Sequence, residues 1–227
     1  MALASDIIAR VRTQLIDEAP TRRWTDAELL RWLSDGQRTI AALAPSSVNK
    51  VSVVKLVPGT RQTLPADGHM LLTVTRNMGK SGTKPGRAVR VVSREIMDAQ
   101  NPEWHADPAS TDVRNFLYDP QDTRTFFVYP PSNGLGYVEI NYAYVPNELT
   151  DLSDMLAVRD IHLTALFDYV MFRAHQKDSD YAAGQALAST YMQAFMLTVT
   201  GRLSGELEDS PNMQLAPFNP QVRGAAK

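Results

Sequence analysis

The chain has 227 residues, of which 44% are hydrophobic, and its 23 basic and 25 acidic side chains give a net charge of −2. This composition suffices for a folded core, and the charge balance argues against a protein that binds nucleic acid by electrostatics alone. The absence of cysteine excludes disulfides, thiolate metal sites and a cysteine nucleophile.

The sequence contains no membrane or export signal. The first residues, MALASDIIARVR, lack the apolar segment of a signal peptide. No run approaches the roughly 18–20 apolar residues that span a bilayer. We therefore expect a soluble protein that is made in the cytoplasm and has no membrane partner.

Two helices are predicted before residue 48. The first has apolar residues at helical spacing and a cap at Ser5. The second follows a capping box of Thr25 and Glu28, in which Trp24 packs on Leu29 as a hydrophobic staple. Two short helices joined by a turn can read DNA, but acidic side chains on the second helix would repel phosphate. A helical hairpin that packs on later helices is the favoured interpretation.

Short strands are predicted from residue 48 to residue 154. They are separated by turn dipeptides such as Pro58-Gly59 and Asn133-Gly134, which favours a small antiparallel sheet or sandwich. Segment 87–92 is expected to pair with strand 71–76 and to close a flexible, glycine-rich loop. Ser93 is expected to cap a short helix, and Trp104 to pin irregular structure after it. An acidic loop at residues 148–154 is interpreted as solvated surface rather than a calcium site.

The stretch from Val158 to Arg202 predicts two helices with a polar break between them. The first, about 160–175, is apolar on nearly every face and must be buried on most sides, within the subunit or between subunits. A charge at Asp168 needs an arginine partner on another element or subunit. The second helix is slim in its first half, where small residues allow a neighbour to approach. The residues expected at a subunit contact are Asp168, Phe172, Arg173, Tyr191 and Phe195.

The last residues predict an extended arm. Prolines and the lack of periodicity after Ser204 indicate a segment that becomes ordered on a partner. Its candidate docking residues are Pro211, Pro217, Phe218 and Pro220.

No pattern predicts an active site, a metal site or a cofactor. Gly79-Lys80-Ser81 lacks the earlier glycine of a phosphate-binding loop, because that position is Val74. The informative patch is basic, since the stretch 76–94 holds six cations and no acidic residue. Its candidate contacts with DNA phosphates or an acidic protein surface are Lys80, Lys84, Arg87 and Arg90. A solvated loop remains the other interpretation.

Several short sequences occur in an order typical of one protein family. They are Asp6-Ile7-Ile8 with Arg12, Arg23 to Leu29, Asp35 to Arg38, Gln62 to Pro65, Val128 to Pro131, Glu139-Ile140 with Tyr142, Asp168 to Val170 with Phe172 to Ala174, Lys177-Asp178, and Tyr191 with Phe195. Over roughly Asp6 to Arg202 the chain resembles the head–tail adaptor (head-completion, or neck) proteins of tailed bacteriophages. Gly36 departs from the family pattern, which more often has a larger polar residue there.

The resemblance implies a structural protein of the virion neck. Such proteins form a ring, typically a dodecamer, below the portal protein, where they extend the channel for genomic DNA and dock further neck or tail proteins. DNA would pass without sequence specificity, and the C-terminal arm would reach into the portal or a neighbouring copy. The main alternative is a DNA-binding regulator that uses the N-terminal helices and the basic loop at residues 76–94.

The predicted fold is α+β and mainly α. Residues 1–47 and 155–203 are expected to form one helical domain, an N-terminal helical hairpin with a long C-terminal helical pair. Residues 48–154 form a β-rich insertion, and residues 204–227 form the arm. Copies would meet through two different surfaces that close around an axis.

Overall fold

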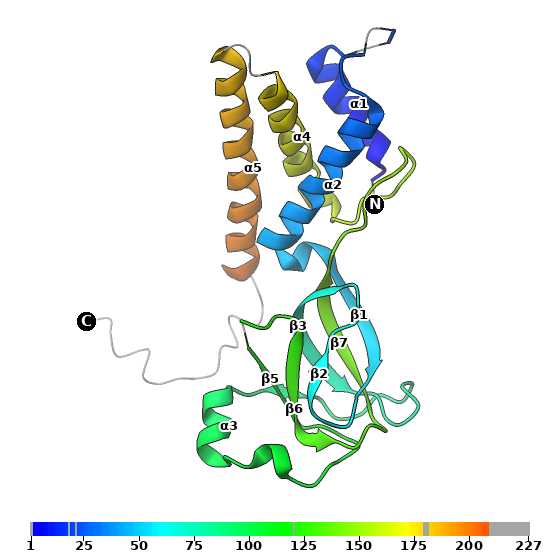
Figure 1. The fold of residues 1–227 in the computed structure, drawn as a ribbon, viewed down its shortest axis with the longest axis vertical. Helices are drawn as coiled ribbons and strands as arrows, with labels where there is room; N and C mark the ends of the chain where they lie inside the picture. Colours follow the sequence, from blue (N-terminus) through cyan, green and yellow to red (C-terminus); the bar gives the residue numbers. More distant parts are fainter. Residues whose placement is uncertain (1, 18, 21, 120, 179–181, 209–227) are drawn as a thin grey trace, which may run out of the picture. The chain divides into compact units, whose positions relative to one another are not determined.

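The computed structural model describes residues 2–17, 19–20, 22–119, 121–178 and 182–208, and its fold is α+β (Figure 1). The elements in order are α1 (Ala4–Leu15), α2 (Asp26–Leu43), η1 (Pro45–Val48), β1 (Asn49–Lys55), β2 (Gly59–Thr63), β3 (Gly68–Asn77), β4 (Arg90–Val91), α3 (Arg94–Gln100), η2 (Trp104–Ala106), β5 (Asn115–Tyr118), β6 (Thr125–Ser132), β7 (Tyr137–Tyr144), η3 (Asp160–His162), α4 (Leu163–Lys177) and α5 (Ala182–Glu208).

The chain divides into two compact units. The β unit consists of Gln37–Leu149 and Met155–Arg159, and the helical unit consists of Ala2–Gly36, Thr150–Asp154 and the described residues from Asp160 onward. The division differs from the predicted boundary at residues 47 and 48, because it falls inside helix α2. It differs again near residue 154, because the short segment before η3 belongs to the β unit.

Helix α4 lies at the centre of the helical unit, with α1 on one side and α5 on the other (Figure 1). Tyr169 packs edge-on against Phe195 of α5, with ring centroids 5.2 Å apart. On another side, α2 approaches α4 closely, because a Cβ added at Gly36 would lie 3.0 Å from the Tyr169 ring. The apolar character of α4 on most faces is therefore satisfied within one chain, so it does not require a second subunit.

The N-terminus of α1 is capped by a loop distant in sequence. The backbone N–H groups of Ala4 and Ser5 donate to the carbonyls of Asp154 and Leu152, each at 2.9 Å. The Asp6 carboxylate accepts a further bond from the Leu3 N–H at 2.9 Å. The predicted cap at Ser5 is wrong, because Ser5 lies inside the helix and the free N–H groups find partners in the loop.

That capping loop, residues 150–154, is organised by its own carboxylates. The Asp154 carboxylate accepts hydrogen bonds from the N–H of Thr150 at 2.7 Å and of Asp151 at 2.9 Å. These backbone donors, first that of Asp151, lower the pKa of Asp154. Among the described residues no cluster of potential metal ligands occurs. The acidic residues thus shape the loop that holds α1.

The capping box at the start of α2 is confirmed. The Glu28 N–H donates to Thr25 Oγ1 at 3.2 Å, and the Thr25 N–H donates to Glu28 Oε2 at 3.3 Å. The buried Trp24 packs edge-on against Trp32, with centroids 5.6 Å apart. The aromatic ring before the cap therefore fixes how the chain enters the helix.

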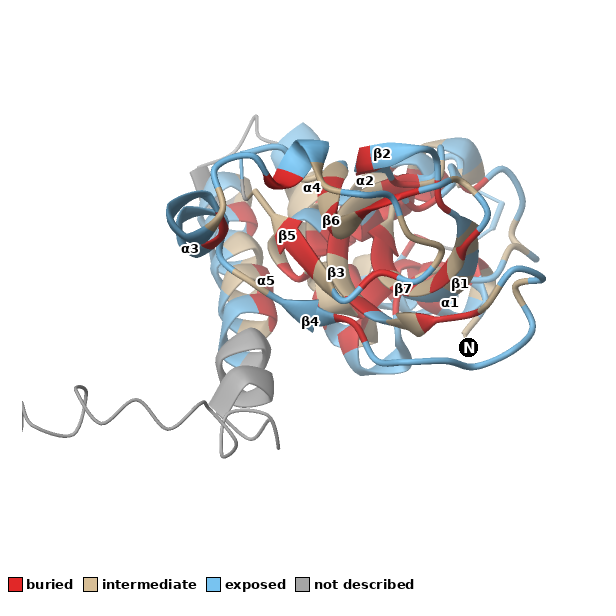
Figure 2. Cartoon of the chain, turned by 90° about the horizontal axis from the view of Figure 1, so that it is seen from below, coloured by how far each residue is buried: buried red, intermediate tan, exposed pale blue. Residues whose placement is uncertain are grey.

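The β unit contains two small sheets that share one core. The order of the first is β1-β7-β3, all antiparallel, and that of the second is β2-β6-β5-β4. Both contribute buried side chains to the core, which Figure 2 shows in the interior of the unit. These include Leu71, Val74, Phe126, Val128 and Ile140. A β-rich unit was predicted, but the second sheet is mixed, because β4 pairs with β5 in parallel.

Segment 87–92 pairs with β3 only at its start. Arg76 and Ala88 form an isolated antiparallel bridge, and the chain then crosses to β5 as strand β4. Ser93 precedes α3 as predicted. Trp104, fully buried, pins the following turn, and its Nε1–H donates to Asp98 Oδ1 at 2.8 Å.

Helix α5 continues to Glu208, past Ser204, where an extended arm was expected to begin. The four candidate docking residues of that arm, Pro211, Pro217, Phe218 and Pro220, lie outside the described residues. Across the part of the chain that the structure describes, no helix combines the length and hydropathy of a membrane span.

Candidate interaction surfaces

The basic loop between β3 and β4 is anchored at both ends. The Met78 N–H donates to the Tyr137 carbonyl at 2.7 Å, and the Tyr137 N–H donates to the Gly79 carbonyl at 3.0 Å. Gly79 and Gly82 adopt positive φ angles of 67° and 74°, which suit glycine. We expected a flexible loop, but its first two residues are tied to Tyr137, the first residue of β7, and Gly86 and Arg87 at its other end are bonded to Asn77.

A buried amide, Asn77, fixes the start of this loop. Its Nδ2 donates to the carbonyls of Arg87 at 2.9 Å and Val113 at 2.8 Å, and its Oδ1 accepts the Val113 N–H at 2.9 Å. All the polar atoms of this side chain are thus satisfied in the interior. Sequence reasoning missed Asn77, although a lone polar residue at the end of an apolar strand is a signal for such a role.

The six cations from Arg76 to Arg94 fall into two groups. Arg76 pairs with Glu139 at 2.9 Å, and Arg94 pairs with Asp98 at 3.4 Å. The remaining four are exposed, and none of them makes an ion pair with any residue that the structure describes. These are Lys80, Lys84, Arg87 and Arg90.

Arg114 is a further exposed cation beside this group, and no sequence pattern pointed to it. Its carbonyl accepts the Arg90 N–H at 3.0 Å, since β4 runs alongside β5. The loop and the neighbouring strand therefore present a positively charged surface without internal acidic partners among the described residues.

Asp168 is half-buried on α4, and its nearest opposing charge belongs to the same chain. Burial raises the pKa of the Asp168 carboxyl, and the positive charge of Arg10 on α1 partly opposes this rise. The Arg10 guanidinium lies over the Phe167 ring, 5.1 Å from its centroid. The predicted arginine on another element is therefore Arg10, which acts across space rather than through an ion pair.

The other predicted contact residues occupy different environments. Phe195 is fully buried against Tyr169, so its side chain has no surface left for a neighbouring copy. Tyr191 is half-buried and stacks on His175, with centroids 5.5 Å apart and rings nearly parallel. Phe172 and Arg173 are also half-buried on α4. Of the five, Phe195 belongs to the core, and the other four reach the surface.

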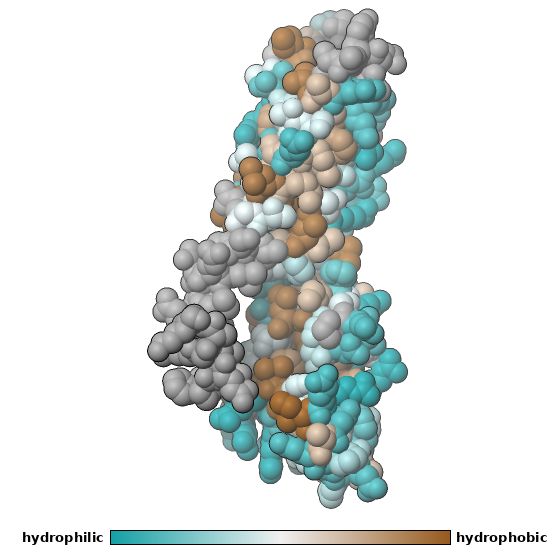
Figure 3. Space-filling model, turned by 90° about the vertical axis from the view of Figure 1, so that its left-hand side faces the viewer, coloured by the Kyte–Doolittle hydropathy of each residue, from teal (hydrophilic) through white to brown (hydrophobic). Residues whose placement is uncertain are grey.

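The stretch of α5 from Ala182 to Gly201 contains no charged residue. Of the residues in this stretch whose exposure is described, only Ala188, Phe195 and Val199 are buried. Leu187 is 47% exposed and Leu197 is 74% exposed. Viewed from the α5 side, Figure 3 shows brown apolar side chains among pale neutral ones along the helical unit. A helix facing water normally carries charged residues on its outer side, so this face is suited to contact with protein.

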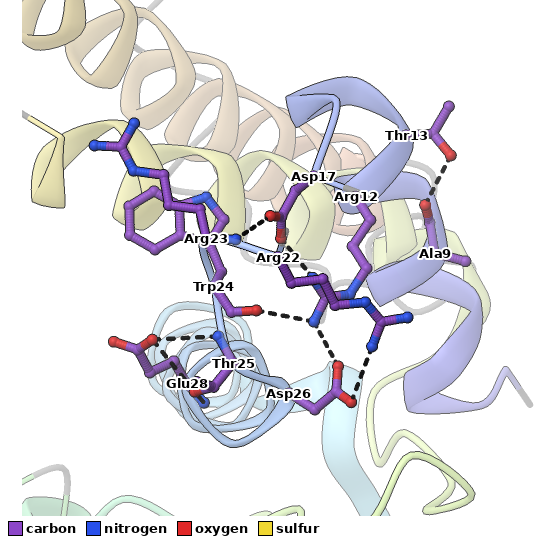
Figure 4. Close-up of polar contacts among 10 residues, drawn as sticks. All are labelled: Ala9, Arg12, Thr13, Asp17, Arg22, Arg23, Trp24, Thr25, Asp26 and Glu28. Carbon is purple, nitrogen blue, oxygen red and sulfur yellow. Dashed lines mark hydrogen bonds and ion pairs between the residues drawn. The ribbon is translucent and has the colours of Figure 1, made fainter. Parts of the chain in front are cut away.

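One end of the helical unit is held by charged side chains around Arg12 (Figure 4). The buried Arg12 guanidinium pairs with Asp17 and with Asp26, the latter at 2.5 Å, and donates to the Trp24 carbonyl at 3.0 Å. Asp17 also accepts the backbone N–H of Arg23. The turn after α1 is thereby fixed to the start of α2.

The same turn is tied to the end of α4. Arg23 pairs with Asp178, with Nη1 donating to Oδ2 at 2.7 Å, and Lys177 pairs with Glu28. The hydrogen bond from Lys177 lowers the pKa of Glu28. These pairs are partly exposed and contribute little stability individually, but together they orient the turn.

The sequence model of the SU10 adaptor protein family matches residues 2–220. The chain belongs to this family. No curated protein sequence matches it. The SU10 adaptors are bacteriophage adaptor proteins, so the role is that of a structural virion component, which implies that the protein is not an enzyme.

Membership of the SU10 adaptor family agrees with the placement of α2. A DNA-reading helix presents exposed side chains to the major groove. In this adaptor half of α2 is buried, including Leu29, Leu30, Trp32 and Leu33, and only four of its residues are exposed, among them Arg31 and Arg38. The alternative of a DNA-binding regulator is not favoured.

Proposed function

We propose that this SU10 adaptor forms a ring at the head–tail junction, below the portal protein, and extends the DNA channel there. The observation that supports this most directly is the uncharged stretch of α5 from Ala182 to Gly201. An uncharged surface of this length, with Leu187 and Leu197 exposed, is expected to be covered by protein in the assembled virion.

The ring would be heterologous, because each copy would offer two different surfaces to its neighbours. The surface residues proposed for these contacts are Asp168, Phe172, Arg173 and Tyr191. Their half-buried positions on α4 and α5 leave part of each side chain available. The stoichiometry we propose is twelve, as the family resemblance implies.

The basic loop would contact either the phosphates of passing DNA or an acidic surface of a partner. Its four exposed cations have no acidic partner among the described residues, so they are available for such a contact. Contacts with phosphate are independent of sequence and weaken with salt, which suits DNA that only passes through. The C-terminal segment after Glu208, with Pro211, Pro217, Phe218 and Pro220, would dock on the portal or a neighbouring copy.

Native mass spectrometry of the full chain, with and without portal rings, tests the proposal. We expect a cyclic oligomer that forms, or becomes more stable, on addition of the portal, and only weak binding to duplex DNA. A small oligomer that binds duplex DNA with steep salt dependence and ignores the portal would contradict the proposal.

A further inference from the structure

The residue that ends α1, Ile16, has an unusual backbone conformation. Its φ and ψ are 54° and 38°, in the left-handed region. The N–H of Asp17 donates to the Arg12 carbonyl at 2.9 Å and that of Ile16 to the Thr13 carbonyl at 3.3 Å, which closes the helix with a Schellman-type turn. Glycine normally occupies this position, because a side chain there is strained, and a β-branched one most of all.

Packing within the chain does not account for this isoleucine. Ile16 is 87% exposed, so its side chain gains almost nothing from burial. Its sequence neighbours Thr13, Gln14, Ala19 and Pro20 are exposed and neutral, and the acidic Asp17 is turned inward to Arg12. The hollow beside Ile16 is also lined by the ion pair of Arg23 and Asp178. The turn therefore presents an exposed apolar side chain that is held in place by the charged pairs around it.

A shallow groove without charged residues runs between α4 and α5. Phe172, Ala188 and Met192 provide its apolar lining, and Gln176, Gln185, Ser189 and Gln193 contribute neutral polar side chains. No charged residue lines the groove. The thioether of Met192 is flexible and polarizable, and such side chains adapt to an inserted apolar group.

Ile16 and the groove lie at the same end of the helical unit but on different sides of α4. Ile16 shares a small hollow with Ala174 and His175, which are neighbours in sequence of the groove residues Phe172 and Gln176. Figure 1 shows α1 and α5 on opposite sides of α4. In a ring whose copies are related by rotation, opposite sides of this unit face different neighbours, so Ile16 of one copy can meet the groove of the next.

We propose that Ile16 of one copy inserts into the α4–α5 groove of the neighbouring copy. This inference rests on the proposed ring and identifies the two different surfaces that meet in it. A contact between a protruding side chain (the Ile16 knob) on one side of a copy and a groove on the other side of the next copy is heterologous, so it can be repeated around a closed ring.

Cysteine crosslinking tests the contact, since the full-length chain contains no cysteine of its own. The variant carries Ile16→Cys and Met192→Cys together, and it is oxidised at a concentration where native mass spectrometry shows multimers. We expect a ladder of covalent multimers on a denaturing gel. The matched control carries Ile16→Cys with Thr190→Cys, because Thr190 is exposed on α5 but does not line the groove. It should give no ladder.

A second variant, Ile16→Gly, separates assembly from folding. Glycine relieves the left-handed strain, so we expect the melting temperature of the monomer to rise by about 2–4 °C. Loss of the knob should at the same time weaken self-association at least tenfold. A residue with only a structural role would not move the two quantities in opposite directions.

The outcomes distinguish this contact from the ring itself. Multimers that show no crosslink between positions 16 and 192, or that persist in Ile16→Gly, overturn the contact and leave the ring in place. A chain that remains monomeric alone and in complex with portal rings overturns both.

Discussion

Replacement of Arg12 by methionine tests whether the buried guanidinium holds the helical unit together. Methionine keeps an unbranched apolar stem of similar length but removes the positive charge. In the parent, Arg12 pairs with Asp17 and Asp26 and donates to the Trp24 carbonyl. Its loss leaves the carboxylate of Asp17, which is only 4% exposed, without its cation.

The expected cost follows from that geometry. Removing one partner of a buried ion pair typically destabilises a protein by about 3–5 kcal/mol, because the remaining charge stays buried. In a chain of this size the corresponding fall in melting temperature is on the order of 10 °C. The double variant Arg12→Met/Asp17→Asn should recover part of this loss, since it removes both buried charges.

Urea unfolding followed by tryptophan fluorescence measures the loss of stability of the helical unit in Arg12→Met. Trp24 and Trp32 belong to the helical unit and Trp104 to the β unit, so a Trp104→Phe background restricts the signal to the helical unit. Arg22→Met is the matched control, because Arg22 reaches the same Asp26 at 3.5 Å from an exposed position and should cost less than about 1 kcal/mol. If Arg12→Met were no more destabilising than Arg22→Met, the reasoning would be refuted.

Three further predictions concern other parts of the molecule. Asn77→Ala removes three hydrogen bonds in the interior and should destabilise the β unit by about 2–4 kcal/mol. Urea unfolding followed by Trp104 fluorescence measures this loss, with the exposed Asn147→Ala as the control. An equal effect of both variants would count against the role of Asn77. Burial raises the pKa of Asp168 in the folded protein above its value in the unfolded chain. The folded protein is therefore most stable, as far as this group is concerned, below the unfolded pKa, and it loses that stability as the pH rises through the folded pKa. Asp168→Asn should therefore melt at a higher temperature than the parent at pH 7, with the difference shrinking toward pH 4; a lower melting temperature at pH 7 would show that attraction to Arg10 dominates. Replacement of Lys80, Lys84 and Arg87 by glutamate should leave the melting temperature unchanged but reduce DNA retention or the assembly of particles. Replacement of Lys55, Arg61 and Arg124 by glutamate is the control and should reduce neither. Normal particles with both variants would assign the loop to solvated surface.

Several features of this adaptor could be predicted from residues that lie close together in the sequence. Thr25 and Glu28 cap α2 as predicted, because the partners in a capping box are three residues apart and need no tertiary contact. Ser93 precedes a short helix as predicted, although its side chain makes no capping hydrogen bond. The cap of α1 was predicted wrongly, since its partners, Leu152 and Asp154, come from a loop far along the chain.

Pairing between distant segments could not be read from local pattern. Segment 87–92 has the composition of a strand, but it pairs with β3 only at its start, through the bridge of Arg76 and Ala88, and continues alongside β5 as β4. The charged pairs of Arg12 also join residues up to 14 apart, across a turn whose course only the fold defines.

The sequence by itself determined that the first of the two C-terminal helices is apolar on most faces, that residues 182–201 carry no charge, that no catalytic pattern is present, and that the chain resembles phage adaptors. Only the tertiary structure decided which apolar helix is inside. α4 is covered by α1, α2 and α5, whereas α5 is covered on one side and exposes Leu187 and Leu197 on the other. The physical reason is that burial depends on which elements surround a helix, and residues distant in sequence supply those elements.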